Sequence, residues 1–126
     1  MIINSVDDIK VIKDFIAAND KVAFDIETNS LQPIGGKIVG FGVSNAKEGH
    51  YVTHLAWNAD SQELEEKVPY KVCKEVLSLL TSKDWVGWNS SFEIRFVRRY
   101  FNIDLAPSLH SEGMLAVHTV DENRMS

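Results

Sequence analysis

The segment Lys21–Glu27, KVAFDIE, constrains the fold more than any other part of the chain. Apolar side chains occupy every second position in it: Val22, Phe24 and Ile26. This period of two is typical of a β-strand. The same period places Asp25 and Glu27 on one common face. A segment otherwise typical of a buried strand therefore carries two carboxylates one residue apart, which calls for a chemical explanation.

The remaining pattern predicts an α/β fold with a mixed β-sheet flanked by helices. Helices are expected at about residues 6–19, with Ser5 as N-cap, and at 70–82 and 89–100. The stretch 37–57 predicts two strands around the turn NAKEG, and DWVGWN predicts another. We expect 58–69 to be an exposed connection, whereas the apolar run 114–120 fits either a helix or a strand.

Length and composition narrow the class of protein. With 126 residues, the chain is expected to form one domain, residues 1–126. It contains no apolar run near the roughly 20 residues of a membrane helix, and its start, MIINSVDDIK, does not resemble a secretory signal, so a cytoplasmic location without membrane contact is expected. The single Cys73 excludes an internal disulfide and a cysteine-based zinc cluster. Four scattered histidines are predicted to be ordinary surface or core residues: His50, His54, His110 and His118.

The formal net charge of −5 excludes a general basic field for nucleic acid, so any such contact must be local. Two acids on one strand face can instead share hard cations, because carboxylate oxygens suit magnesium and manganese. The alternative for Asp25 and Glu27 is a solvated face of an edge strand.

A second candidate lies in GWNSSFE, where a strand ends and a helix begins. Glu93 falls in the first helical turn, near the ends of neighbouring strands, and could add a ligand to the same metal ions. The alternative is structural, since a glutamate at a helix start interacts favourably with the helix dipole and Asn89 is a suitable N-cap.

FDIETNSL and NSSFE together resemble the first two motifs of the DEDD superfamily of 3′–5′ exonucleases, within the ribonuclease H-like fold. The nearest likeness is to proofreading domains of family A DNA polymerases of the bacterial and phage type. SEGMLAVHTVDENR is similar to a further segment of that family, so the resemblance runs from about residue 20 to the C-terminus.

The resemblance implies roles for individual residues. The metal ligands for two Mg²⁺ or Mn²⁺ ions would be Asp25, Glu27 and Glu93. The residues near the 3′-terminal nucleotides would be Thr28, Leu31, Asn89 and Phe92. Ordinary packing is the alternative for Leu31 and Phe92.

Three departures separate the chain from the family pattern. Glu93 stands in place of an aspartate, and Glu112 with Gly113 stands in place of Asp-Thr. The third motif, with its aspartate and a tyrosine or histidine, is missing, and the spacing of His118 and Asp121 does not restore it. The chain is therefore expected to be a form truncated before the third motif.

Two functions are expected to compete. One is two-metal hydrolysis of 3′-terminal phosphodiester bonds of DNA, as the proofreading part of a polymerase in a bacterial or phage-infected cell. The other is a catalytically inactive domain that binds single-stranded nucleic acid or another protein. Side chains for such binding are a basic patch and three tryptophans that could instead be core: Arg95, Arg98, Arg99, Trp57, Trp85 and Trp88. The choice of DNA rather than RNA as the substrate rests on the likeness to polymerase domains alone. A third possibility is an unrelated α/β protein that matches the motifs by chance.

Overall fold

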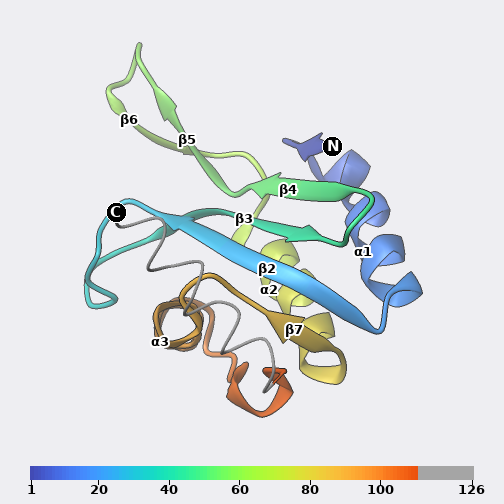
Figure 1. The fold of residues 1–126 in the computed structure, drawn as a ribbon. Helices are drawn as coiled ribbons and strands as arrows, with labels where there is room; N and C mark the ends of the chain where they lie inside the picture. The colour runs from blue at the N-terminus through green and yellow to red at the C-terminus, as the bar shows by residue number, and fades with distance from the viewer. Residues whose placement is uncertain (111–126) are drawn as a thin grey trace.

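The computed structural model describes residues 1–110. Its centre is a five-stranded mixed sheet with the strand order β1-β4-β3-β2-β7 (Figure 1). The strands are β1 (Ile2–Ile3), β2 (Lys21–Thr28), β3 (Ile38–Ser44), β4 (Gly49–Thr53) and β7 (Asp84–Val86). Antiparallel pairing joins β2 to β3 and β3 to β4, whereas β1 runs parallel to β4 and β7 runs parallel to β2. The two strands predicted around the turn NAKEG are β3 and β4, which form a hairpin beside β2.

Three helices accompany the sheet: α1 (Ile9–Ala18), α2 (Tyr70–Leu79) and α3 (Ser90–Phe101). Short 3-10 turns precede α1 and follow α2, at Val6–Asp8 and Leu80–Ser82, and a third lies at Ala106–Ser108. The three predicted helices are thus confirmed, although α1 begins three residues later than expected because Val6–Asp8 forms a 3-10 turn. Among residues 1–110, no helix is long and apolar enough to cross a membrane.

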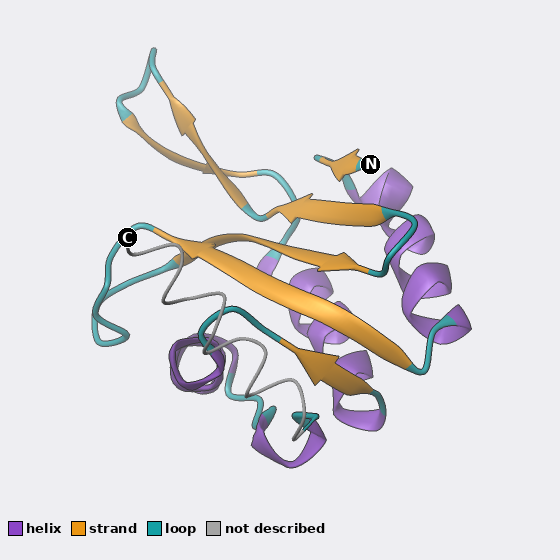
Figure 2. Cartoon of the chain, viewed as in Figure 1, coloured by secondary structure: helices purple, strands orange, loops and turns teal. Residues whose placement is uncertain are grey.

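Figure 2 shows the helices, in purple, beside the strands of the sheet, in orange. One hydrophobic core joins the sheet to the helices. The predicted apolar face of β2 contributes its alternating residues, and the buried positions of each helix face the same side of the sheet: Ile12, Phe15, Ile16, Cys73, Val76, Leu77, Phe96, Val97 and Phe101. Trp85 of β7 is fully buried, and its indole N–H donates to the carbonyl of Leu105 (2.8 Å). The opposite face of the sheet carries the polar positions of β2.

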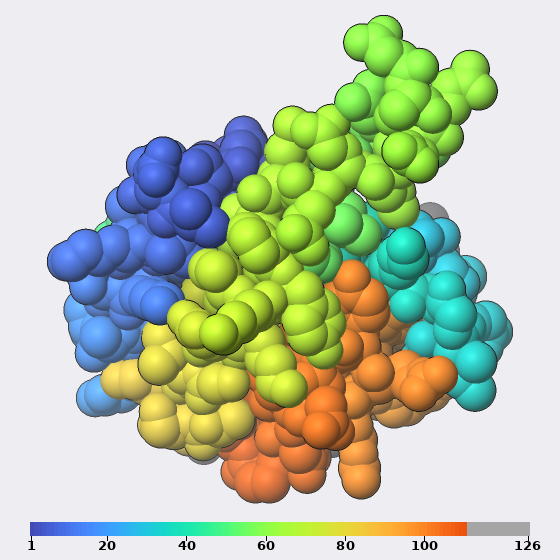
Figure 3. Space-filling model, turned by 180° about the vertical axis from the view of Figure 1, so that it is seen from behind, coloured from blue at the N-terminus to red at the C-terminus, as the bar shows by residue number. Residues whose placement is uncertain are grey.

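Three strands were not predicted: β1, β5 (Leu55–Asn58) and β6 (Glu63–Glu66). The expected second strand of the stretch 37–57 had joined β5 to β4. β1 has only two residues, too few to show a period. The expected connection 58–69 was wrong in part, because it contains β6, which pairs antiparallel with β5. The segment ELEE has one apolar residue, so only its pairing partner makes it a strand. We call residues 55–66 the arm, since this hairpin projects from the body (Figure 3).

The predictions for residues 111–126 lie outside the described residues. They concern the run 114–120, Glu112, Gly113, His118 and Asp121.

Candidate active site

Asp25 and Glu27 lie on the exposed face of β2. The apolar residues that alternate with them point into the core: Val22, Phe24 and Ile26. β2 lies between β3 and β7, so it is an interior strand. The alternative of a solvated face on an edge strand is therefore wrong about the edge, whereas both acids do lie on an exposed face. An interior strand is held by hydrogen bonds on both sides, which makes it a rigid base for two side chains that must act at one place.

Glycines of β3 keep the space beside these carboxylates open. Asp25 is opposite Gly42, and Glu27 is opposite Gly40. The Tyr51 ring of β4 fills part of this space, lying against Gly40, and a Cβ atom there would overlap with the phenol and lie 2.8 Å from the carbonyl oxygen of Val52. At Gly42 the nearest atoms to an added Cβ are 3.7 and 3.8 Å away, an ordinary contact distance. Only Gly40 is thus required by close packing.

Tyr51 connects the two acidic positions electrostatically. Its hydroxyl donates a hydrogen bond to Oε2 of Glu27 (3.3 Å). Partial burial, the charge of Glu27, this hydrogen bond and the charge of Asp25 together raise the pKa of Tyr51 to about 12. The phenol therefore keeps its proton at neutral pH and remains a donor toward the carboxylates.

A groove of about 930 Å³ runs across the open face of the sheet, and Asp25 lines it. Small side chains of β2 and β3 form its floor, among them Ala23, Gly42 and Ser44. Tyr51 and Trp88 also line it, and 38% of Trp88 is exposed. Because the three floor positions carry little more than backbone, they leave space above the sheet.

Glu93 is built into the protein in a different way. It lies in the first turn of α3 and is only 1% exposed. Its carboxylate packs against Gly87, just after β7, where an added Cβ would lie 2.8 Å from Oε2. Gly87 continues the strand that pairs parallel with β2, which places the Glu93 carboxylate at the β7–α3 junction beside that strand.

The donor chemistry fits a hard divalent cation in part. Asp25 and Glu27 offer carboxylate oxygens on one face, which is the ligand type that Mg²⁺ and Mn²⁺ prefer. Within residues 1–110, however, no three His, Cys, Asp or Glu side chains are close enough to form a metal-binding group. The predicted set of Asp25, Glu27 and Glu93 is therefore not brought together as three ready ligands.

The other predicted site residues take up separate positions. Asn89 is the N-cap of α3, and its side chain accepts a hydrogen bond from the Phe92 N–H (3.3 Å), which confirms its structural reading. Thr28 donates its hydroxyl to the carbonyl of Ser30 (2.7 Å). Phe92 is half-buried and packs on Phe96, with ring centroids 5.3 Å apart.

Leu31 lies in the loop after β2, and 82% of it is exposed. Packing in a core is therefore wrong for this residue. Of the three tryptophans, Trp85 is core, whereas Trp57 of the arm is 65% exposed. His54 is buried, and each of its ring nitrogens has a partner: the Val68 carbonyl (2.7 Å) and the Tyr100 hydroxyl (2.9 Å), a structural role.

The sequence reasoning missed Gly40, Tyr51 and Gly87. A signal existed for Gly40, because the alternation in IVGFGVS places two glycines on one face of that strand. In the sheet this is the face that also carries Asp25 and Glu27. No comparable sequence signal existed for Tyr51, because its approach to Glu27 depends on the register of β4 against β3.

Comparison with known proteins identifies the family. A family model described as the RNase H superfamily matches residues 22–122. The chain belongs to the RNase H superfamily. This membership confirms the predicted α/β fold of the ribonuclease H-like class. A search of curated proteins finds no match.

A solved structure supports the same fold for this RNase H superfamily member. The Aedes aegypti Nibbler EXO domain superposes with a TM-score of 0.63 at 10% sequence identity. The match covers 94% of this chain and 55% of that one, so this chain spans about half the length of the mosquito structure. At this identity the likeness concerns the fold.

Proposed function

We propose that this RNase H superfamily domain takes part in metal-dependent hydrolysis of nucleic acid, removing nucleotides from a 3′ end. The observation that carries the proposal is the pair Asp25 and Glu27, exposed together on a rigid interior strand, with space for a substrate at Gly42 beside Asp25. The similarity in fold to an EXO domain supports the exonuclease direction.

The roles of the chain's own residues follow from their positions. Asp25 and Glu27 would hold the divalent ion, and Tyr51 keeps the Glu27 carboxylate oriented by its hydrogen bond. When bound, such an ion supplies charge that helps to activate water and to stabilise a leaving oxygen. In the hydrolysis, the water oxygen bonds to phosphorus, the bond from phosphorus to the leaving 3′ oxygen breaks, and that oxygen takes up a proton.

We further propose DNA as the substrate and proofreading beside a family A polymerase as the context. The motifs FDIETNSL and NSSFE support this reading, with Asp25, Glu27 and Glu93 as metal ligands. Thr28, Leu31, Asn89 and Phe92 would adjoin the terminal nucleotides. The rest of a polymerase would then be the partner, in the cytoplasm of a bacterial or phage-infected cell.

One observation favours a second candidate, a domain that binds single strands without cleaving them. Glu93 is buried, and the described part of the chain contains no group of three ligands. Two carboxylates alone give a divalent cation an incomplete ligand set. This candidate uses the same exposed face but assigns it no chemistry.

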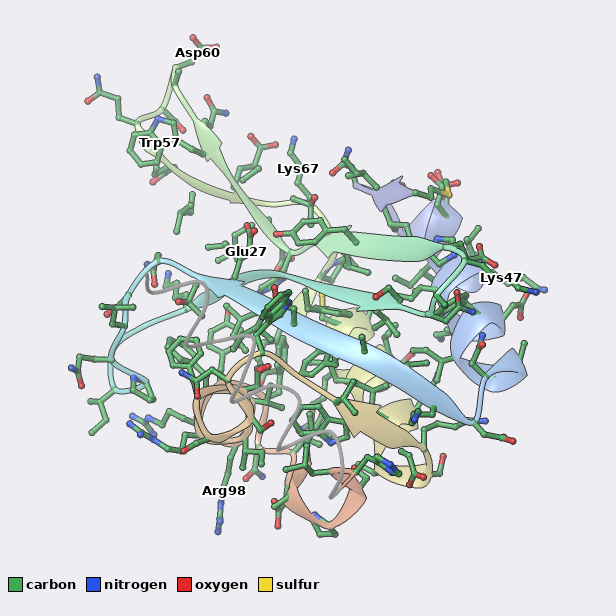
Figure 4. All side chains as sticks on the ribbon, viewed as in Figure 1. Glu27, Lys47, Trp57, Asp60, Lys67 and Arg98 are labelled. Carbon is green, nitrogen blue, oxygen red and sulfur yellow. The ribbon has the colours of Figure 1, made fainter. Side chains whose placement is uncertain are left out.

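The deciding experiment incubates the 126-residue chain with a 5′-labelled single-stranded DNA and either Mn²⁺ or Mg²⁺. We expect stepwise shortening from the 3′ end that requires the metal and is lost in Asp25→Ala. The matched control is Asp60→Ala, which removes an exposed aspartate at the tip of the arm, far from Glu27 in Figure 4, and it should cleave like the wild type. No cleavage by a folded chain would favour the binding candidate, and internal cuts would overturn the exonuclease assignment.

A further inference from the structure

Two surfaces of opposite charge flank the exposed carboxylates. The arm carries four acidic residues and no basic one between positions 55 and 66: Asp60, Glu63, Glu65 and Glu66. The helix α3 carries three arginines, and its only acid, Glu93, is buried. In Figure 4, Glu27 lies between Trp57 of the arm and Arg98 of α3. The two sides of the site therefore offer opposite environments to a charged ligand.

The arginines form one surface of the helix. Arg95, Arg98 and Arg99 are spaced i, i+3 and i+4, which places them on one face, and all three are exposed. No salt bridge joins any of them to another residue between positions 1 and 110. A helix rises about 1.5 Å per residue, so the three charges extend over about 6 Å along the axis. Guanidinium groups held in this way can contact neighbouring phosphates of one strand.

The loop between β2 and β3, residues 29–37, joins this surface to the carboxylates. It begins two residues after Glu27 and is closed at its base by Asn29, whose N–H donates to the Lys37 carbonyl (3.1 Å) and whose Oδ1 accepts from the Lys37 N–H (2.7 Å). Its other end packs on α3, since a Cβ atom at Gly36 would lie 2.6 Å from Cζ of Phe96. The loop and α3 adjoin at the surface in Figure 3.

Two large apolar side chains project from this loop. Leu31 is 82% exposed and Ile34 is 79% exposed. Apolar side chains beside a line of cations suit single-stranded nucleic acid, because its unpaired bases offer apolar faces and its phosphates are attracted by positive charge. A double helix would cover such a loop less well, since its bases are already stacked on one another.

We propose that the arginine face of α3, with Leu31 and Ile34 of the adjoining loop, is the surface along which a single-stranded nucleic acid approaches Asp25 and Glu27. The strand runs over α3 and away from the arm, because the four acids of the arm repel phosphates. That the 3′ end of the strand is the one that reaches the carboxylates rests on the proposed function. The binding surface itself depends only on charge and exposure.

The test measures binding of a 5′-fluorescein-labelled oligothymidylate of about 12 nucleotides by anisotropy, over a series of salt concentrations and with EDTA so that nothing is cleaved. The variant Arg95→Gln/Arg98→Gln/Arg99→Gln should bind at least tenfold more weakly. Its slope of log affinity against log salt should be smaller by about 2, since each lost phosphate contact on a single strand contributes about 0.7.

The matched control is Lys10→Gln/Lys47→Gln/Lys71→Gln, which lowers the net charge by the same three units at exposed positions outside α3 and the loop. Figure 4 shows Lys47 far from Arg98. This control should bind within about twofold of the wild type. Leu31→Ala/Ile34→Ala should lower the affinity and leave the salt slope unchanged, because it removes apolar contacts and no charge.

Three results would overturn the inference: no binding by the folded wild type, equal losses in the arginine and lysine variants, or an unchanged salt slope in the arginine variant. The proposed function fails separately. If the arginine variant loses binding as expected but the wild type does not shorten DNA with Mn²⁺, the surface stands and the nuclease assignment falls. If DNA is shortened and the arginine variant binds normally, the strand takes another path.

Discussion

The two halves of the candidate site, the β2–β3 face and the β7–α3 junction, are built in opposite ways. On the first, Asp25 and Glu27 are exposed on a strand whose stability comes from its other face. At the second, the Glu93 carboxylate is buried and packs against Gly87. The acids of the two motifs, which were predicted to bind the same metal ions, thus differ in exposure and in their part in packing. The strand acids are exposed to solvent, whereas Glu93 is also part of the packing.

Between the two halves of the candidate site, the largest effect on stability should come from Gly87→Ala. A new Cβ would overlap with the buried Glu93 carboxylate, and overpacking of this kind costs about 1–3 kcal/mol. Urea unfolding followed by circular dichroism measures it. The double variant Gly87→Ala/Glu93→Ala removes the overlap, so its loss should be smaller than the two single losses combined. Additive losses would show that the two residues do not interact in this way.

A smaller effect is expected on the other half, at Gly40. In Gly40→Ala the added Cβ meets the Tyr51 phenol and the Val52 carbonyl, and we expect a loss of about 1–2 kcal/mol in the free energy of unfolding. Gly42→Ala, two residues on and on the same face, has room for its methyl group and should stay within about 0.5 kcal/mol of the wild type. Equal losses in the two variants would contradict the difference in packing.

Tyr51 provides a test at alkaline pH. The fold raises the pKa of this phenol from 10.0 to about 12, so the folded protein holds the proton more tightly than the unfolded chain. This contribution to stability is complete below pH 10 and is lost as the pH rises toward 12. Because the side chain is only partly buried, we expect about 1 kcal/mol.

Unfolding measured between pH 9 and 12 for the wild type and Tyr51→Phe gives the comparison. The variant lacks the titrating group, so the difference in its unfolding free energy from the wild type should shrink across that range. Tyr100, whose pKa burial also raises, is present in both proteins and cancels. A constant difference across the range would mean that neither burial nor the two carboxylates raise the pKa of the phenol in the folded protein.

The smallest change in stability should follow Asp25→Ala. The side chain is exposed on a strand that its other residues hold in place, so we expect a change within about 0.5 kcal/mol or a slight gain from removing repulsion with Glu27. Thermal unfolding of this variant beside Gly87→Ala measures the contrast between the two halves directly. A loss of fold in Asp25→Ala would show that the carboxylate supports the structure.

The sequence was sufficient wherever the decisive interactions are local. The strand at 21–27, its two faces, the hairpin beside it and the three helices follow from apolar periodicity, and the N-cap role of Asn89 follows from its place before a helix. The common face of Asp25 and Glu27 follows from the period of two alone. β6 escaped prediction because it depends on its partner strand rather than on its own side chains.

What only the tertiary structure decided is how these elements meet. The sequence could not say that β2 is an interior strand, because strand order depends on pairing between distant segments. It could not bring Tyr51 to Glu27 or place Gly87 against Glu93, since both approaches depend on strand register and on the position of α3. Alternation along one strand determines which side chains share a face. Contacts between segments that are distant in the sequence determine which face is exposed and which residues lie beside it.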